Sequence, residues 1–161
     1  MRRGLPIAIL VILATPSAAQ AFQIKDLWAT VNICDPPGAR NVIGVRASMP
    51  RNGPNQRMFM RFYTQWFDGT KRRWVASGST SRWMRVRTAG SRPTQVGFSF
   101  QFADPPRGTQ FLMRGVVNYQ WRAPGGKRVV RRATRVTKRG QRGVGGGIPP
   151  GRSDTSCIIS F

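Results

Sequence analysis

The chain has 161 residues, enough for one ordinary domain, and a formal net charge of +22. It contains 27 Lys and Arg residues against 5 acidic ones, all of them Asp, and no His. Its two cysteines are far apart in the sequence, and together with the lack of histidine this excludes an ordinary zinc site; the lack of histidine also excludes a Cys–His nucleophile. Such a charge predicts attraction to polyanions: nucleic acid, anionic lipid headgroups or acidic wall polymers. The alternative is that a GC-rich genome supplies many arginines that are merely solvated.

The N-terminal segment has the pattern of an export signal. Two arginines precede an apolar run from Leu5 to Ala14, and small residues follow. The A-x-A pair of Ala19 and Ala21 predicts cleavage after Ala21, with cleavage after Ala19 as the alternative. We therefore expect residues 1–21 to be a signal peptide and the protein to be secreted or extracytoplasmic, in the cell wall if it binds wall polymers. An uncleaved membrane anchor is the other interpretation, although the run is about half the ~20 residues that a spanning helix needs.

Two cysteines remain after cleavage, Cys34 and Cys157. Export leads to an oxidising compartment, so one intramolecular disulfide between them is expected. A free reactive thiol is the alternative, but a nucleophilic cysteine needs a base such as His. Loss of the two signal-peptide arginines leaves a net charge of about +20 on the mature chain.

In the mature chain, short runs of alternating apolar and polar residues are separated by turn signals, which is typical of β-strands. The clearest run has Val96, Phe98, Phe100 and Phe102 on one face and small or polar residues on the other. Asp68-Gly69 is a hairpin signal. Strands are expected over residues 27–33, 43–49, 56–67, 72–76, 83–87, 96–102, 111–121 and 128–138.

Seven or eight such strands, with no visible crossover helix, predict an all-β fold. The expected architecture is an antiparallel β-sandwich over residues 22–139, with a closed barrel as the main alternative. Beyond Arg139 the chain is rich in Gly and Pro and offers no core residues. Residues 140–161 are therefore expected to form a flexible tail, tied back to the body by the disulfide of Cys157.

The strand order, the Trp66 strand, and Tyr119-x-Trp121 followed by a basic strand resemble immunoglobulin and fibronectin type III domains. With one cysteine early and one after the last strand, the segment 114–138 is similar to uncharacterised secreted Ig-like domains of actinobacteria. The chain departs from antibody-type domains, because Cys157 lies in the tail and not in the penultimate strand. The resemblance implies an Ig-like or fibronectin type III-like sandwich and a surface role, and it supplies no catalytic residues.

Aspartates are the only acids available for catalysis. Asp35 and Asp104 each precede Pro-Pro and Asp68 precedes Gly69, so turn chemistry accounts for them. A secreted hydrolase with paired aspartates would need two carboxylates brought together. No Asp-rich calcium loop occurs, and Gly143–Gly147 lacks the G-K-[ST] ending of a phosphate loop. We expect no catalytic residues, no metal site and no cofactor.

The densest basic segment is the candidate polyanion patch. Its arginines fall on both faces of the expected strand, which also fits an edge strand whose charge prevents association between sheets. Trp74 and Trp83 lie near arginines in the sequence and would stack on nucleic-acid bases if exposed, or else belong to the core or its rim. The patch comprises Lys127, Arg128, Arg131, Arg132, Arg135, Lys138, Arg139 and Arg142.

The sequence therefore predicts a non-catalytic secreted or cell-surface module with a binding or structural role. A cationic effector that binds nucleic acid, anionic lipid or wall polymer is the first alternative, and an aspartate hydrolase the second. Acidic polymers or other cell-envelope components are the partner classes that fit the charge, and the sequence points to no small-molecule substrate.

Overall fold

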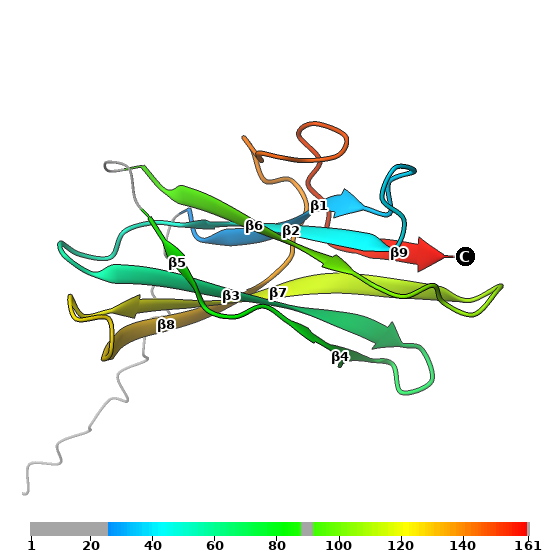
Figure 1. Cartoon of the computed structure of the whole chain (residues 1–161), viewed down its shortest axis with the longest axis horizontal. Coiled ribbons are helices and arrows are strands. Elements are labelled where there is room, and N and C mark those ends of the chain that lie inside the picture. Colours follow the sequence, from blue (N-terminus) through cyan, green and yellow to red (C-terminus); the bar gives the residue numbers. More distant parts are fainter. Residues whose placement is uncertain (1–25, 88–91, 161) are drawn as a thin grey trace, which may run out of the picture.

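The structure is a computed structural model that describes residues 26–87 and 92–160, so the expected signal peptide lies outside the described residues. Within these ranges the chain is all β, with two antiparallel sheets that pack as a sandwich (Figure 1). No described segment is a helix long and apolar enough to cross a membrane. The predicted antiparallel β-sandwich is confirmed, with nine strands among the described residues instead of seven or eight.

The first sheet, sheet A, has three strands in the order β1-β2-β6: β1 (Trp28–Cys34), β2 (Val42–Met49) and β6 (Thr94–Gln101). The second, sheet B, has six. Its main path is β4 (Arg73–Thr80), β3 (Arg57–Asp68), β7 (Gln110–Arg122) and β8 (Val129–Val136). β5 (Met84–Val86) also pairs with β3, and β9 (Cys157–Ser160) with β7. β8 pairs with β7 alone, so the predicted edge strand is confirmed.

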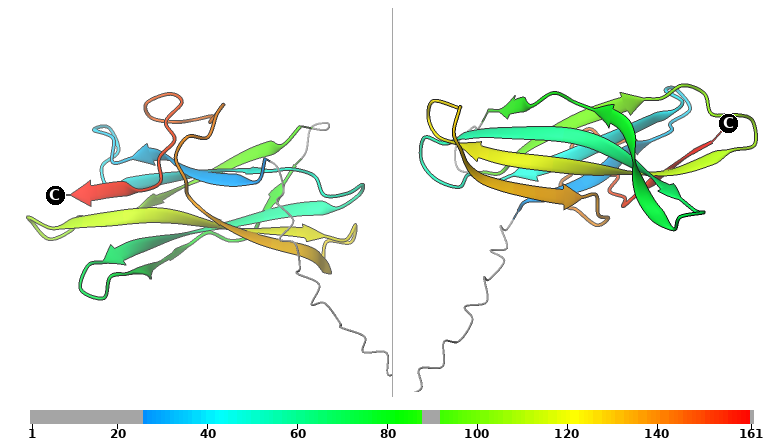
Figure 2. Two further views of the ribbon diagram at one scale, coloured as in Figure 1. Left: turned by 180° about the vertical axis from the view of Figure 1, so that it is seen from behind. Right: turned by 90° about the horizontal axis from the view of Figure 1, so that it is seen from below.

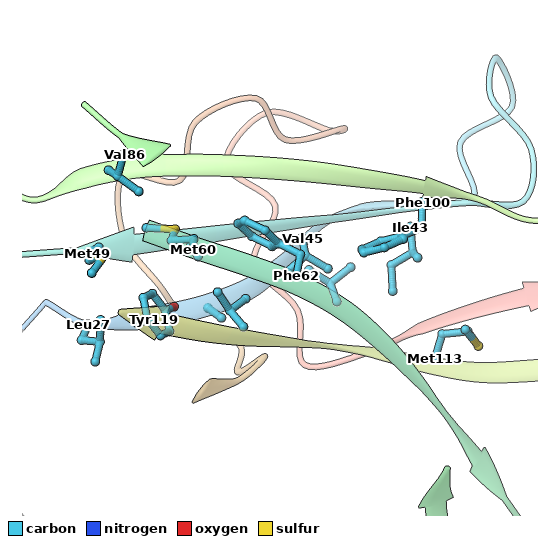
Figure 3. Packing of buried hydrophobic residues seen from close by; sticks show 14 of the residues in the cluster. Leu27, Ile43, Val45, Met49, Met60, Phe62, Val86, Phe100, Met113 and Tyr119 are labelled. Carbon is cyan, nitrogen blue, oxygen red and sulfur yellow. The ribbon is translucent and has the colours of Figure 1, made fainter. Parts of the chain in front are cut away.

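Period-2 patterning builds the core between the sheets (Figure 3). In β3, the buried residues Met58, Met60 and Phe62 alternate with more exposed neighbours, as the sequence predicts for a strand with one buried face. The sheets lie close together at Gly115 of β7, where an added side chain would overlap Val45 of the opposite sheet. Only glycine fits there without displacing β2.

Tyr119 and Trp121 of β7 are fully buried and carry polar groups that reach backbone carbonyls. The hydroxyl of Tyr119 donates to the carbonyl of Trp28 in β1 at 2.7 Å, and burial raises the pKa of Tyr119 above its ordinary value. The indole Nε1 of Trp121 donates to the carbonyl of Pro50 at 3.0 Å. Both bonds tie sheet B to the chain of sheet A, because buried donors need partners.

The predicted disulfide is confirmed. Cys34 at the end of β1 is bonded to Cys157 at the start of β9, with the Cα atoms 5.3 Å apart. Since β1 belongs to sheet A and β9 to sheet B, this bond joins the two sheets covalently.

Residues 140–156 contain no named strand, as their glycine content predicts, but they are not a free arm. Val31 of β1 and Asp154 exchange two backbone hydrogen bonds of 2.9 Å. The side-chain amide of Asn32 donates to the carbonyl of Gly146 at 2.8 Å. The segment therefore runs along the unpaired edge of β1 (Figure 1, orange to red), and its last residues form β9. Hydrogen bonds to β1 hold the segment, and Val144 within it is buried. The sandwich therefore extends to residue 160.

Candidate functional site

The basic segment of residues 127–142 does not form one surface, because β8 divides it. Arg132 lies opposite Gln120 on the solvent side of sheet B. Arg131 and Arg135 lie opposite Trp121 and Val117, whose side chains are in the core, so both arginines are on the inner side of the edge strand. Lys127 and Arg128 are exposed before β8, and Lys138, Arg139 and Arg142 are exposed after it.

The two inner arginines hold parts of the fold together. A terminal nitrogen of Arg131 donates to the side chain of Asn52, and its guanidinium carbon lies 5.6 Å from the ring centroid of Trp121. Arg135 donates from Nε to the carbonyl of Leu27 at 3.3 Å and from Nη1 to that of Thr134 at 2.9 Å. Removing these side chains would disturb local structure as well as charge.

The solvent side of sheet B carries the richest set of binding groups. Its positions alternate with the core positions of the same strands, and the right-hand view of Figure 2 looks onto it. Arginines and aromatic rings alternate across the strands on this surface, which we call the arginine–aromatic face. It comprises Arg57, Phe59, Arg61, Tyr63, Phe67, Trp74, Trp83, Arg85, Arg114, Arg122 and Arg132.

Contacts between neighbouring strands hold these groups in place. The guanidinium carbon of Arg122 lies 4.0 Å from the ring centroid of Phe59 and 5.5 Å from that of Trp83. The guanidinium carbon of Arg114 lies 4.2 Å from the ring of Trp74, which packs edge-on against Phe67 at 5.4 Å. Cation–π contacts of this kind position a guanidinium while part of it stays open to a ligand.

Hydrogen bonds to glutamines orient two of the arginines further. Arg114 donates from Nε to Gln65 at 2.8 Å, and Arg122 donates from Nε to Gln120 at 2.9 Å. Partial burial lowers the pKa of Arg114 from its ordinary value, and the nearby Tyr63 opposes this shift. Arginine stays protonated in proteins, so both groups are fixed positive charges.

Among the residues that the structure describes, no carboxylate occupies an outward position of this face. The nearest strand residue of that type, Asp68, ends β3 and is turned to the other side, opposite Arg73. Its carboxylate accepts a hydrogen bond from the backbone of Lys71 at 3.0 Å and pairs with the Lys71 ammonium at 3.4 Å. That backbone bond is the main reason why the pKa of Asp68 is lowered. The arginines of the face are therefore not neutralised by acids of the same surface.

The aspartates considered for catalysis have structural partners. Asp35 accepts a hydrogen bond from the backbone of Asn41, and Asp104 accepts one from the Asn41 side chain. Together they connect the loops that follow β1 and β6. Among the described residues, no three His, Cys, Asp or Glu side chains gather as a metal site.

Sequence reasoning found part of this face and missed the rest. Trp74 and Trp83 stood out as aromatic residues next to arginines, whereas the outward residues of β3 and β7 did not. The sequence could have revealed them, because they alternate with the buried residues of the same strand. Phe59 and Tyr63, for example, lie between the buried positions of β3. A scan against protein-family models finds no match for this chain, and a search of curated proteins finds none either.

Proposed function

We propose that this protein is a non-catalytic secreted or cell-surface module of Ig-like type whose arginine–aromatic face binds polyanions. The strand order supports the type. In immunoglobulin lettering, β1-β2-β6 corresponds to A-B-E and β4-β3-β7-β8 to C′-C-F-G. The export-signal pattern of residues 1–21 and the Cys34–Cys157 disulfide support an extracytoplasmic location.

The observation that carries the proposal is a sheet surface with fixed guanidinium groups, aromatic rings and no carboxylate. Guanidinium groups bind phosphate and sulfate oxygens, and displacement of counterions from the polyanion supplies the affinity. Interleaved rings add a surface on which nucleic-acid bases stack. An ordinary solvated sheet face would intersperse both signs of charge.

The first test removes three exposed arginines of the face, R57Q/R85Q/R132Q, and compares them with R92Q/R107Q/R139Q, which removes three exposed arginines elsewhere. The wild type should bind heparin at about 0.15 M salt. Only the face variant should elute at clearly lower salt. On duplex DNA, the slope of log K against log[salt] should shrink by about 0.9 for each phosphate that the face variant no longer neutralises.

Two outcomes would contradict the proposal. If the wild type is not retained on heparin at ~0.15 M salt, the net charge has no polyanion-binding role under these conditions. If both triple variants are weakened equally, the charge acts diffusely and the face is not a site.

The second test concerns the rings of the face. Trp83→Ala should weaken binding of a single-stranded oligonucleotide by about 5- to 150-fold, since stacking on one ring contributes roughly 1–3 kcal/mol per base. Heparin has no bases, so its binding should stay within about twofold of the wild type. Equal losses for heparin and oligonucleotide would show that Trp83 acts by positioning Arg122 and not by stacking. Fluorescence anisotropy at fixed salt measures both.

A further inference from the structure

A second basic site lies on the other side of β8, where the start of β1 faces the chain that follows β8. A pocket of about 520 Å³ opens there. Its charged lining residues are Arg135, Lys138 and Arg142 on one side and Asp26 on the other, with Trp28 and Gln141 beside them. This volume is within the usual range for small-ligand sites. The arginine–aromatic face contributes none of these residues.

We propose that this pocket binds a phosphate monoester group. Three cationic side chains and one carboxylate give the lining a net charge of +2, which complements a group that carries −1.5 to −2 charges at pH 7. Guanidinium groups match the spacing of phosphate oxygens and bind them with two parallel hydrogen bonds. A carboxylate or a sulfate ester, each with one negative charge, would leave part of this positive charge uncompensated.

Arg135 is the preorganised member of the set. Its Nε and Nη1 atoms donate to the carbonyls of Leu27 and Thr134, which fix the plane of the guanidinium on the pocket wall. A guanidinium has five N–H donors, so donors remain for an anion after these two bonds.

The part of the lining that follows β8, residues 138–142, is held by hydrogen bonds of its own backbone. The N–H of Lys138 donates to the carbonyl of Ala29 at 2.9 Å. The N–H of Gln141 donates to the hydroxyl of Ser153 at 2.9 Å. Lys138 and Arg142 therefore project from a fixed backbone, and their long side chains need only change rotamer to reach an anion.

The test uses glycerol 1-phosphate as the probe and calorimetry or the Trp28 contribution to fluorescence as the readout. Lys138→Gln and Arg142→Gln should each weaken binding about tenfold, the usual effect of removing one hydrogen bond to a charged group. Arg139→Gln removes an exposed charge between them that does not line the pocket, and it should have less than a twofold effect. Asp26→Asn should tighten binding about threefold, since it removes the only repulsive charge of the lining and Asn accepts the positive φ of this position.

The pH dependence gives an independent readout. The second pKa of a phosphate monoester is about 6, so binding should weaken about tenfold from pH 7 to pH 5 as the ligand loses its second charge. The chain has no His to titrate in that range. Methyl sulfate keeps a single charge throughout, so it should bind more weakly and show no such change. A pH effect shared by both ligands would overturn the phosphate assignment.

A second binding experiment distinguishes two sources of a phosphate monoester, a lipid headgroup and a soluble metabolite. Vesicles of phosphatidic acid present it on a lipid, and a sugar phosphate presents it in solution; phosphatidylglycerol vesicles, which carry a diester, are the control. If Arg142→Gln binds phosphatidic acid vesicles more weakly than Arg139→Gln does, but both bind the sugar phosphate equally, the natural ligand is a lipid. If the two variants differ only in their affinity for the sugar phosphate, the natural ligand is soluble. Absence of saturable binding to any monoester, or equal losses for the two variants, overturns the proposal. The triple face variant R57Q/R85Q/R132Q should bind glycerol 1-phosphate normally, so failure here is separable from failure of the arginine–aromatic face.

Discussion

Replacing both cysteines, as C34A/C157A, is expected to lower the free energy of unfolding by about 4–5 kcal/mol. The bond closes a loop with a sequence separation of 123 residues, and chain-entropy theory assigns a loop of that length about this much destabilisation of the unfolded state. The free energy of unfolding of most single domains is only about 5–15 kcal/mol, so the variant should be only marginally stable. Urea denaturation of the oxidised wild type and the double variant measures the difference.

The reduced wild type is the matched control, because it keeps both side chains and loses only the bond. Its free energy of unfolding should be close to that of the double variant. Suppose that both proteins lose less than about 1 kcal/mol in free energy of unfolding. Residual contacts of residues 140–160 would then already keep the ends of the loop together in the unfolded chain, and the explanation by loop entropy would be wrong. Hydrogen exchange would then show protection of β9 in the reduced protein equal to that in the oxidised one.

The fold class and the disulfide were predictable because each depends on simple features of the sequence. Strands with one buried face have period 2, and Met58, Met60 and Phe62 follow it directly. Two cysteines in a chain that begins with an export-signal pattern leave one intramolecular pairing. The edge position of β8 was also predictable, since arginines on both faces of a strand do not fit a strand that is covered on both sides.

The division of the basic segment between two faces follows from period 2, but which of its arginines face solvent was not predictable, because that depends on register. Pairing between β7 and β8 shifts between Trp121 and Arg122, and such an irregularity changes which side chains share a face. Arg132 points to solvent because it pairs with Gln120, and Arg131 points inward because it pairs with the buried Trp121. The alternation of residues within β8 alone does not reveal these partners. The candidate patch was defined by basic density along the chain, so it combined Arg131 and Arg132, which lie on opposite sides of the sheet.

The packing of residues 140–156 was missed for a different reason. Sequence reasoning looked for apolar residues that could build a core, and this segment offers few. The structure holds it instead with hydrogen bonds between its own backbone and β1, including the side chain of Asn32 and the backbone of Val31. Glycines such as Gly146 allow this path because their positive φ angles are open to few other residues. Contacts of this type leave no periodic signal in the sequence.

Trp121→Ala is expected to lower the free energy of unfolding by about 3–5 kcal/mol, the usual loss for a large buried aromatic side chain. Trp121 is fully buried in β7, and its removal would also leave the carbonyl of Pro50 without its donor. Trp121→Phe separates these two contributions. It keeps a ring in the core and removes the N–H, so it should lose clearly less than Trp121→Ala, with about 1 kcal/mol of its loss from the hydrogen bond.

Trp83→Ala is the matched control on the arginine–aromatic face. Its ring is half-buried and packs beside Arg122 on the solvent side of sheet B, so truncation should cost about 1 kcal/mol or less. Urea denaturation followed by far-ultraviolet circular dichroism compares the variants without depending on tryptophan fluorescence. A loss for Trp83→Ala as large as that for Trp121→Ala would mean that Trp83 belongs to the core. A small loss would place Trp83 where a ligand can reach it, and a weaker affinity of this variant for oligonucleotides could then be assigned to the ring itself.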